Sequence, residues 1–220
     1  MKKLRKHMQM KRIFFAAIAF LLLACNDDFL DQVPDDRLTF DATFSQRNNV
    51  DQYLANIYSR IPNEMAQRYT TTQHSGPWTG ASDEAEYVWS FHWGNYLDVG
   101  DWNATTGEVS SLWSNFYRGI RAASTFIQNV DNCQDCQPDR INQYKAEAKA
   151  LRAFFYYNLI RSWGPVILLG NEPIPADADL SGLKRNTMQE CVDYIVAELD
   201  EAADELEGIS FDGQNAGRMS

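Results

Sequence analysis

The sequence predicts an all-α protein in which long amphipathic helices are joined by long irregular loops. Four segments repeat apolar residues every three or four positions, which is the spacing of one face of a helix. No alternating apolar and polar pattern recurs often enough for a large sheet. Because 45% of the 220 residues are hydrophobic and 23% are charged, the chain can bury a sizeable core and lacks the composition of a disordered protein.

Residues 1–24 have the composition of an export signal. Residues 1–12 are basic, and the run from Ile13 to Ala24 is apolar without a break. A helix of this length spans about 18 Å, which is short of the roughly 30 Å of a membrane core. The run ends in Ala24 and Cys25, which resembles the lipobox of bacterial lipoproteins. We therefore expect a lipoprotein signal peptide over 1–24 and lipidation of Cys25, and the alternative is an ordinary secreted protein with a chance cysteine.

The first predicted helix covers residues 45–61 and the second covers residues 107–130. Thr105 or Thr106 can cap the start of the second helix. Its apolar residues are separated by alternating steps of four and three, which gives one continuous stripe. The stripe consists of Val109, Trp113, Phe116, Ile120, Ala123, Ile127 and Val130. In the first helix the corresponding residues are Val50, Leu54, Ile57 and Ile61.

The third predicted helix begins at Pro138, a residue suited to the first helical position, and stops at Gly164. The fourth begins with Thr187 and Glu190, which have the spacing of a capping box, and ends near Gly208. A short loop joins the second and third helices into an αα-hairpin. Helix pairs of this length are typical of tetratricopeptide units, whose nominal period is about 34 residues.

Three cysteines remain beyond Cys25. Cys133 and Cys136 form a lone CxxC in a polar loop that follows a helix, and Cys191 stands alone. Zinc would require a second pair, and a thioredoxin-type site would require a strand before the motif. In an exported protein we favour a local disulfide, and the alternatives are free thiols or a redox function.

The charge distribution excludes nucleic acid as a partner. Residues 25–220 hold 14 basic and 30 acidic side chains, which gives a net charge of −16. No Lys or Arg lies between Arg68 and Arg118. Affinity for phosphate backbones depends mainly on Lys and Arg, and this chain has too few of them.

Several sequence segments, in their order along the chain, resemble those of one known family. They are FLDQVP at 29–34, WSNFYRGIRAA at 113–123, YKAEAKALRAFFYY at 144–157 and WGPV at 163–166. Together they resemble the N-terminal half of SusD/RagB-family outer-membrane lipoproteins, from Cys25 to the end of the chain. The acids Asp27 and Asp28 resemble the signal that directs Bacteroidetes lipoproteins to the cell surface.

The resemblance implies a fold, a location and a function. The fold would be tetratricopeptide-like helix pairs with long inserted loops. The protein would sit on the outer face of the outer membrane, capture glycan and deliver it to a TonB-dependent SusC-like transporter. It would be a binding protein and not an enzyme, without a cofactor. Because the chain stops at a phrase that resembles the start of the family's next helix, we expect 25–220 to be a truncated N-terminal helical domain.

The candidate ligand segment is 78–102, which holds seven aromatic residues and four of the six tryptophans. A sugar presents an apolar face to an aromatic ring and hydroxyl groups to Asn, Asp or Glu. The proposed contacts are Trp78, Asp83, Trp93, Asn95 and Trp102. The alternative is that these rings pack the loop onto the helices, since Tyr87, Trp89, Phe91 and Trp93 would share one face of an extended segment.

Signals for catalysis are weak. The chain has no GxSxG, P-loop, GxGxxG or HExxH motif, and no spacing supports a metal at His74 or His92. Asp83 with Glu84 or Glu86 could form a glycosidase pair, but acids are abundant here. Two alternatives to a glycan-binding protein therefore remain, a secreted glycan hydrolase and a helical-repeat scaffold that binds proteins. Glu147 and Arg152, in the most specific phrase, are interpreted as structural.

Overall fold

The computed structural model describes residues 40–62, 80, 82–84, 86–90, 92–103, 105–171, 174, 177–208 and 217–219. All of them belong to one unit, residues 40–220. Cys25 and the boundary at 24/25 lie outside the described residues, as does Trp78. The statements below concern the described residues only.

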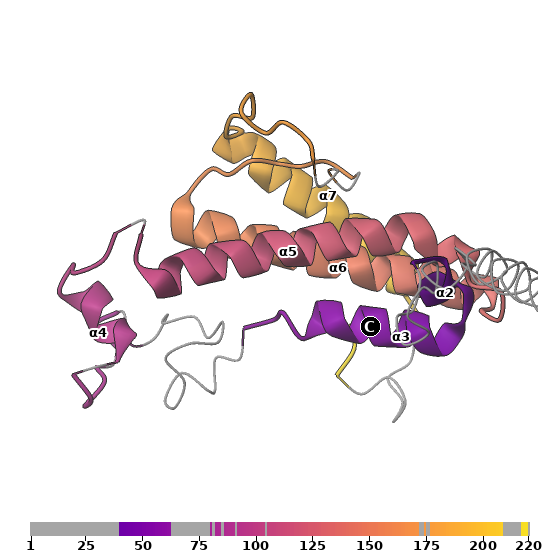
Figure 1. Cartoon of the computed structure of the whole chain (residues 1–220), viewed down its shortest axis with the longest axis horizontal. Coiled ribbons are helices and arrows are strands. Elements are labelled where there is room, and N and C mark those ends of the chain that lie inside the picture. The colour runs from indigo at the N-terminus through magenta and orange to yellow at the C-terminus, as the bar shows by residue number, and fades with distance from the viewer. Residues whose placement is uncertain are drawn as a thin grey trace, which may run out of the picture. The chain divides into compact units, whose positions relative to one another are not determined.

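The described part of the chain is helical, as the sequence predicts. Apart from an isolated bridge residue at Ser82, none of these residues lies in a β-strand. The elements are α2 (Phe40–Ser45), α3 (Arg47–Tyr58), α4 (Trp93–Asp98), α5 (Gly107–Asn129), η3 (Val130–Asn132), α6 (Pro138–Trp163) and α7 (Met188–Leu206) (Figure 1). The four predicted helices are present as α3, α5, α6 and α7. The short helices α2 and α4 were not predicted.

Local chemistry sets most of the helix boundaries. The expected capping box at the start of α7 is present, because Thr187 Oγ1 accepts from the Glu190 amide and the Glu190 carboxylate accepts from the Thr187 amide. Pro138 occupies the first turn of α6, and Gly164 follows its end with φ of 68°, a conformation that favours glycine. The first predicted helix begins two residues late, because Gln46 is extended and separates α2 from α3.

Helix α6 is the central element of the bundle. It packs against α5 on one side and α7 on another, and α3 lies beside this group (Figure 1). Because it has neighbours on several sides, α6 is buried nearly all round. At one contact with α5, a Cβ added at Gly119 would lie 2.6 Å from Phe155 Cε2, so the two helices approach closely only because residue 119 has no side chain.

Arg152, on α6, joins two other parts of the chain to the bundle through contacts inside the core. These parts are α7 and the loop between α6 and α7. The side chain is 1% exposed and forms an ion pair with Glu198 of α7 at 2.6 Å. Its guanidinium also donates to Ser124 Oγ at 2.9 Å and to Asn171 Oδ1 at 3.2 Å. A buried charge requires such partners, and their presence agrees with the structural role expected for Arg152.

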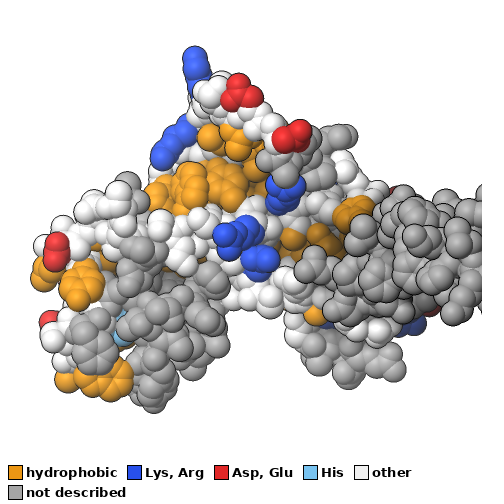
Figure 2. Space-filling model, viewed as in Figure 1, with side chains coloured by type: hydrophobic (Ala, Val, Ile, Leu, Met, Phe, Trp, Pro, Cys, Tyr) orange, Lys and Arg blue, Asp and Glu red, His pale blue; other side chains and the backbone are white. Residues whose placement is uncertain are grey.

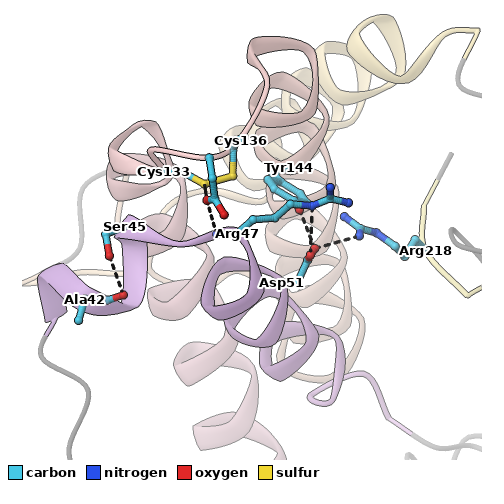
Figure 3. Close-up of a disulfide and its surroundings, with 9 residues drawn as sticks. Ala42, Ser45, Arg47, Asp51, Cys133, Cys136, Tyr144 and Arg218 are labelled. Carbon is cyan, nitrogen blue, oxygen red and sulfur yellow. Dashed lines mark hydrogen bonds and ion pairs between the residues drawn. A yellow bond between two sulfur atoms is a disulfide. The ribbon is translucent and has the colours of Figure 1, made fainter.

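Glu147 and Arg218 fix residues 217–219 onto the bundle. The Glu147 carboxylate is fully buried and accepts from Arg218 at 2.8 Å and from Tyr58 Oη at 2.8 Å. Arg218 also lies 3.4 Å from Asp51 of α3, and Asp51 accepts from Tyr144 Oη at 2.6 Å (Figure 3). Glu147 is therefore structural, as expected, because it joins α6 to α3 and to the segment at 217–219.

Cys133 and Cys136 form the expected local disulfide between η3 and α6 (Figure 3). Inside this loop the Asp135 carboxylate accepts from the Arg47 amide at 2.6 Å, at the first residue of α3. The Gln46 side chain makes no capping bond, so Asp135 caps α3 from 88 residues away. Of the cysteines that the structure describes, the third, Cys191, is free and buried.

Candidate functional site

The candidate ligand segment is organised around the short helix α4. The helix ends in a Schellman motif, in which the Asp101 amide bonds to the Tyr96 carbonyl at 2.8 Å and the Gly100 amide to the Leu97 carbonyl at 3.1 Å. Gly100 takes φ of 71°, the left-handed conformation that this motif requires. The chain is thereby turned sharply just before Trp102.

His92 is a structural residue at the start of α4. It is 2% exposed, and its Nδ1 accepts from the Gly94 amide at 3.2 Å as the helix cap. The Tyr87 ring stacks on the imidazole with centroids 3.6 Å apart. A Cβ at Gly94 would lie 2.6 Å from Tyr87 Cε2, so Gly94 makes room for this stack. Burial raises the pKa of Tyr87, and the nearby Asp98 carboxylate raises it further.

Asn95 holds the turn at 87–89 against α4. Its Oδ1 accepts from the Tyr87 amide at 3.2 Å, and its Nδ2 donates to the carbonyls of Tyr87 and Trp89 at 2.9 and 3.1 Å. Both amide hydrogens are used in these bonds, so only Oδ1 retains capacity for a further partner. Asn95 therefore stabilises the conformation of the segment through these bonds, independently of any contact with a ligand.

The connection from α4 to α5 uses the threonines that were expected to cap α5. Thr106 occupies the N-cap position, but its hydroxyl accepts from the Asn103 amide at 2.9 Å and does not cap the helix. Asn103 Oδ1 in turn accepts from the Thr105 amide and hydroxyl at 2.9 and 2.6 Å. These bonds fix the backbone immediately after Trp102.

Among the aromatic side chains of this segment that the structure describes, three large ones remain exposed. Trp89, Tyr96 and Trp102 are 44%, 39% and 46% exposed. The acids Asp83, Glu84, Asp98 and Asp101 are exposed as well. The arrangement offers apolar rings beside carboxylates on a backbone held by the Asn95 and Schellman bonds, which is the chemistry that a sugar requires.

The five proposed contact residues differ in exposure and in whether the structure describes them. Trp102 and Asp83 are exposed, and Asn95 is half-buried and bonded within the loop. The side chain of Trp93, at the first position of α4, lies outside the described residues, as does Trp78. Trp93 does not continue an extended run with the preceding rings, because it is the first residue of α4. Trp89 and Tyr96 were not singled out, since the sequence does not show which rings of an aromatic cluster stay exposed.

A cavity of about 480 Å³ lies against α5, and side chains of α5 and of the segment between α6 and α7 line it. Its lining includes the aliphatic side chains of Ile120, Ile167 and Leu169, together with Arg118 and Arg121. On this face, hydrophobic side chains gather between α5 and α7 beside basic ones (Figure 2). The lining also includes the rings of Trp113 and Tyr117 and the hydroxyl groups of Ser114 and Ser124, so this cavity too places aromatic rings beside polar groups.

Two further features bear on function. In the described part of the chain, no helix is both long and apolar enough to cross a membrane. Cys133, Asp135 and Cys136 lie close together, but the two sulfur atoms are bonded to each other and are therefore not available as thiolate ligands for a metal.

Comparison with known proteins identifies relatives over most of the chain. Residues 28–212 match a SusD-like family described as starch-binding and associating with the outer membrane. A SusD-like protein of Bacteroides ovatus is 28% identical over 214 residues, which is 96% of this chain and 37% of that protein. SusD-like protein P38 of Formosa agariphila is 33% identical over 101 residues, which is 46% of this chain and 19% of that protein.

Solved structures support the same fold. A laminarin-binding SusD-like protein superposes with a TM-score of 0.65 at 21% identity, covering 80% of this chain and 38% of that one. A protein crystallised with a xylogluco-oligosaccharide superposes with a TM-score of 0.58 at 23% identity, covering 74% and 31%. The chain thus spans well under half the length of the relatives it matches. Its sequence match and its helical architecture together show that the chain belongs to the SusD-like family.

Proposed function

We propose that this protein is a cell-surface lipoprotein that captures a polysaccharide or oligosaccharide and delivers it to a TonB-dependent SusC-like transporter in the outer membrane. The observation that carries the proposal is the exposed set of Trp89, Tyr96 and Trp102 on a backbone fixed around α4. Family membership supports it, as do relatives described as binding laminarin or a xylogluco-oligosaccharide.

The site works by binding and not by chemistry. Trp102 would stack on a sugar face, while Asp83 and other exposed acids would accept from hydroxyl groups. Trp78 and Trp93 would extend the aromatic surface, and Asn95 would position the turn and offer Oδ1. The protein would hold no cofactor and cleave no bond.

Titration calorimetry against laminarin, a xylogluco-oligosaccharide and starch tests the proposal. We expect one glycan to bind, and Trp102→Ala or Trp78→Ala to weaken it by about 1–3 kcal/mol with little change in melting temperature. The control is Phe116→Ala, since the Phe116 side chain is fully buried in the core, whereas Trp113, expected to be core, is only half-buried. That variant should lose about 3–5 kcal/mol of stability.

Three results would reject the assignment. The first is unchanged affinity in both loop variants. The second is a collapse of the melting transition in either loop variant, because the ring would then be core. The third is the appearance of reducing ends during incubation, which would favour a hydrolase.

The location and partner need separate measurements. Mass spectrometry of the membrane fraction should find a lipid-modified N-terminal Cys25. Detergent extraction should co-purify the protein with a TonB-dependent barrel. A mature protein that is soluble and unlipidated would contradict the proposed anchor.

A further inference from the structure

The cavity against α5 is basic in an acidic chain. Its volume of about 480 Å³ falls in the range of small-ligand sites, about 300–1,000 Å³. Arg118 and Arg121 line it, and none of the described lining residues is Asp or Glu, although residues 25–220 carry a net charge of −16. Asp177 and Asp179 lie in the same segment as part of the lining, but both are exposed and neither lines the cavity. Within the described part of the chain, neither arginine forms an ion pair, so both guanidinium groups can receive an anion.

Two neighbouring rows of α5 form the helical side of this cavity. The first row consists of Trp113, Tyr117, Ile120 and Ser124, at steps of four, three and four. The second row lies one position further round the helix and consists of Ser114, Arg118 and Arg121, at steps of four and three. Residues at these steps are neighbours on a helix, so an aromatic and apolar strip runs beside a basic strip.

The segment between α6 and α7 forms the opposite side of the cavity. Ile167, Leu169 and Leu183 contribute aliphatic side chains to the lining. The Tyr117 hydroxyl donates to the Ile167 carbonyl at 3.0 Å and accepts from the Ile167 amide at 3.2 Å, so the segment is attached to α5 at the cavity wall. Residues 217–219 bond to α3 and α6 and do not line the cavity, so α5 and this segment build the described lining.

This combination fits a sugar that carries a carboxylate. Guanidinium groups bind a carboxylate through paired hydrogen bonds, and the rings of Trp113 and Tyr117 can pack against the apolar face of a pyranose. The hydroxyls of Ser114 and Ser124 offer partners for sugar hydroxyl groups, and Ser124 is held in place by a bond from Arg152 at 2.9 Å. A fatty acid also carries a carboxylate, but it has no hydroxyl groups for the serines.

We propose that the α5 cavity binds a uronic acid residue of the captured glycan. Arg118 and Arg121 would hold the carboxylate, while the sugar ring would lie against Trp113 and Tyr117. None of the described residues of α4 lines this cavity, so it is a second site on the protein. The inference rests on the proposed function, because the ligand is a glycan, and it adds the chemical class of that glycan.

Titration calorimetry with three probes on the purified protein tests the inference. Trigalacturonate carries carboxylates, its methyl ester keeps the sugar rings without charge, and octanoate keeps a carboxylate on an aliphatic chain. We expect trigalacturonate to bind at least about tenfold more tightly than its ester, a difference of about 1.4 kcal/mol. Its affinity should fall as the salt concentration rises. Equal binding of acid and ester, or tighter binding of octanoate, would overturn the proposal.

Matched variants locate the bound acid. Arg118→Gln and Arg121→Gln should each weaken trigalacturonate binding by about tenfold, and the double change should leave acid and ester equal. Lys145→Gln is the control and should change neither affinity, because it removes one positive charge from α6 outside the cavity. Ser114→Trp, at an exposed lining position, should fill part of the cavity and weaken both probes without lowering the melting temperature. Full affinity for trigalacturonate in the double arginine variant would contradict the proposal.

Failure of this inference can be told apart from failure of the proposed function. If laminarin, a xylogluco-oligosaccharide or starch binds and trigalacturonate does not, only the inference about the α5 cavity is wrong. Loss of trigalacturonate binding in Trp102→Ala, with no loss in the double arginine variant, would place the acid at α4 and overturn the same inference. If none of these glycans binds, the proposed function fails as well.

Discussion

At the scale of single residues, burial decides which ion pairs matter. Arg152 and Glu198 have side chains that are 1% and 7% exposed, and Arg152 also bonds to Ser124 and Asn171. Lys149 and Glu201 form a pair of nearly equal length, at 2.7 Å, but the Glu201 side chain is 61% exposed. Removing one member of a buried pair leaves an uncompensated charge in the core, whereas an exposed charge returns to water.

We therefore predict that Glu198→Ala lowers the free energy of unfolding by about 3–5 kcal/mol. Glu201→Ala, on the same helix, should have a much smaller effect, because its exposed charge pair is screened by water. Urea unfolding followed by circular dichroism measures both. Equal losses in the two variants would show that Arg152 finds another partner or that water reaches the pair.

At the scale of elements, the CxxC loop determines how α3 begins. Asp135 caps the Arg47 amide, and the Gln134 amide bonds to the Ser45 carbonyl at 3.1 Å, so one loop contacts the junction of α2 and α3 twice. The Cys133–Cys136 disulfide closes this loop and limits the positions that Asp135 can take. The disulfide therefore acts on α3 through Asp135.

Asp135→Ala should lower the free energy of unfolding by about 1 kcal/mol, the usual value of a helix cap, and should speed hydrogen exchange at the Arg47 amide. Gln134→Ala is the control, because Gln134 contributes its backbone amide to the contact. Asp135→Asn should restore part of the loss, since it keeps an acceptor. In the Cys133→Ser/Cys136→Ser background we expect a smaller effect of Asp135→Ala, and full additivity would show that the disulfide and the cap are independent.

Sequence reasoning succeeded for elements whose signals are local. Pro138, Gly164 and the Thr187–Glu190 box act within a few residues, so they mark helix boundaries that the structure shows. The cap of α3 was not readable, because Asp135 lies 88 residues from Arg47. Helix α4 was also missed, because it is short and depends on the stack of Tyr87 on His92 and on the side-chain bonds of Asn95.

For the candidate site as well, the sequence shows the composition of the segment but not its geometry. The density of aromatic residues selected the segment as a candidate, and the structure shows Trp102 exposed; that it binds a ligand stays a prediction. Which other rings stay exposed depends on contacts between residues of the folded segment. Asn95 was chosen for its polarity, but its amide is used mainly to hold the turn at 87–89.

At the scale of the whole molecule, four tyrosines join the helices to the segments between or beyond them. The Tyr58 hydroxyl accepts from the Met219 amide, Tyr117 bonds to Ile167, Tyr156 accepts from the Leu169 amide, and Tyr194 bonds to Asn171. Burial is the main cause that raises the pKa of each of these phenols above its ordinary value of 10.0. Because these phenols are buried, their ionisation is unfavourable in the folded protein.

Alkaline pH should consequently destabilise the folded protein. Burial raises the pKa of Tyr117 and of Tyr194 to about 12, whereas both ionise near 10.0 when unfolded. A pKa raised on folding gives stability that is fully present below pH 10 and is lost as the pH rises towards 12. Each such group contributes at most about 1.4 kcal/mol of lost unfolding free energy per pH unit in that window.

Tyr117→Phe tests this coupling, because it removes the titrating hydroxyl that bonds to the Ile167 amide and carbonyl. The variant should be less stable than the parent protein at pH 8, since the Ile167 groups lose their partner. Its unfolding free energy should then decline less steeply between pH 10 and 12. Tyr157→Phe, which removes a phenol that is 47% exposed, is the control. Urea midpoints measured across this range would contradict the account if the parent and Tyr117→Phe declined in parallel.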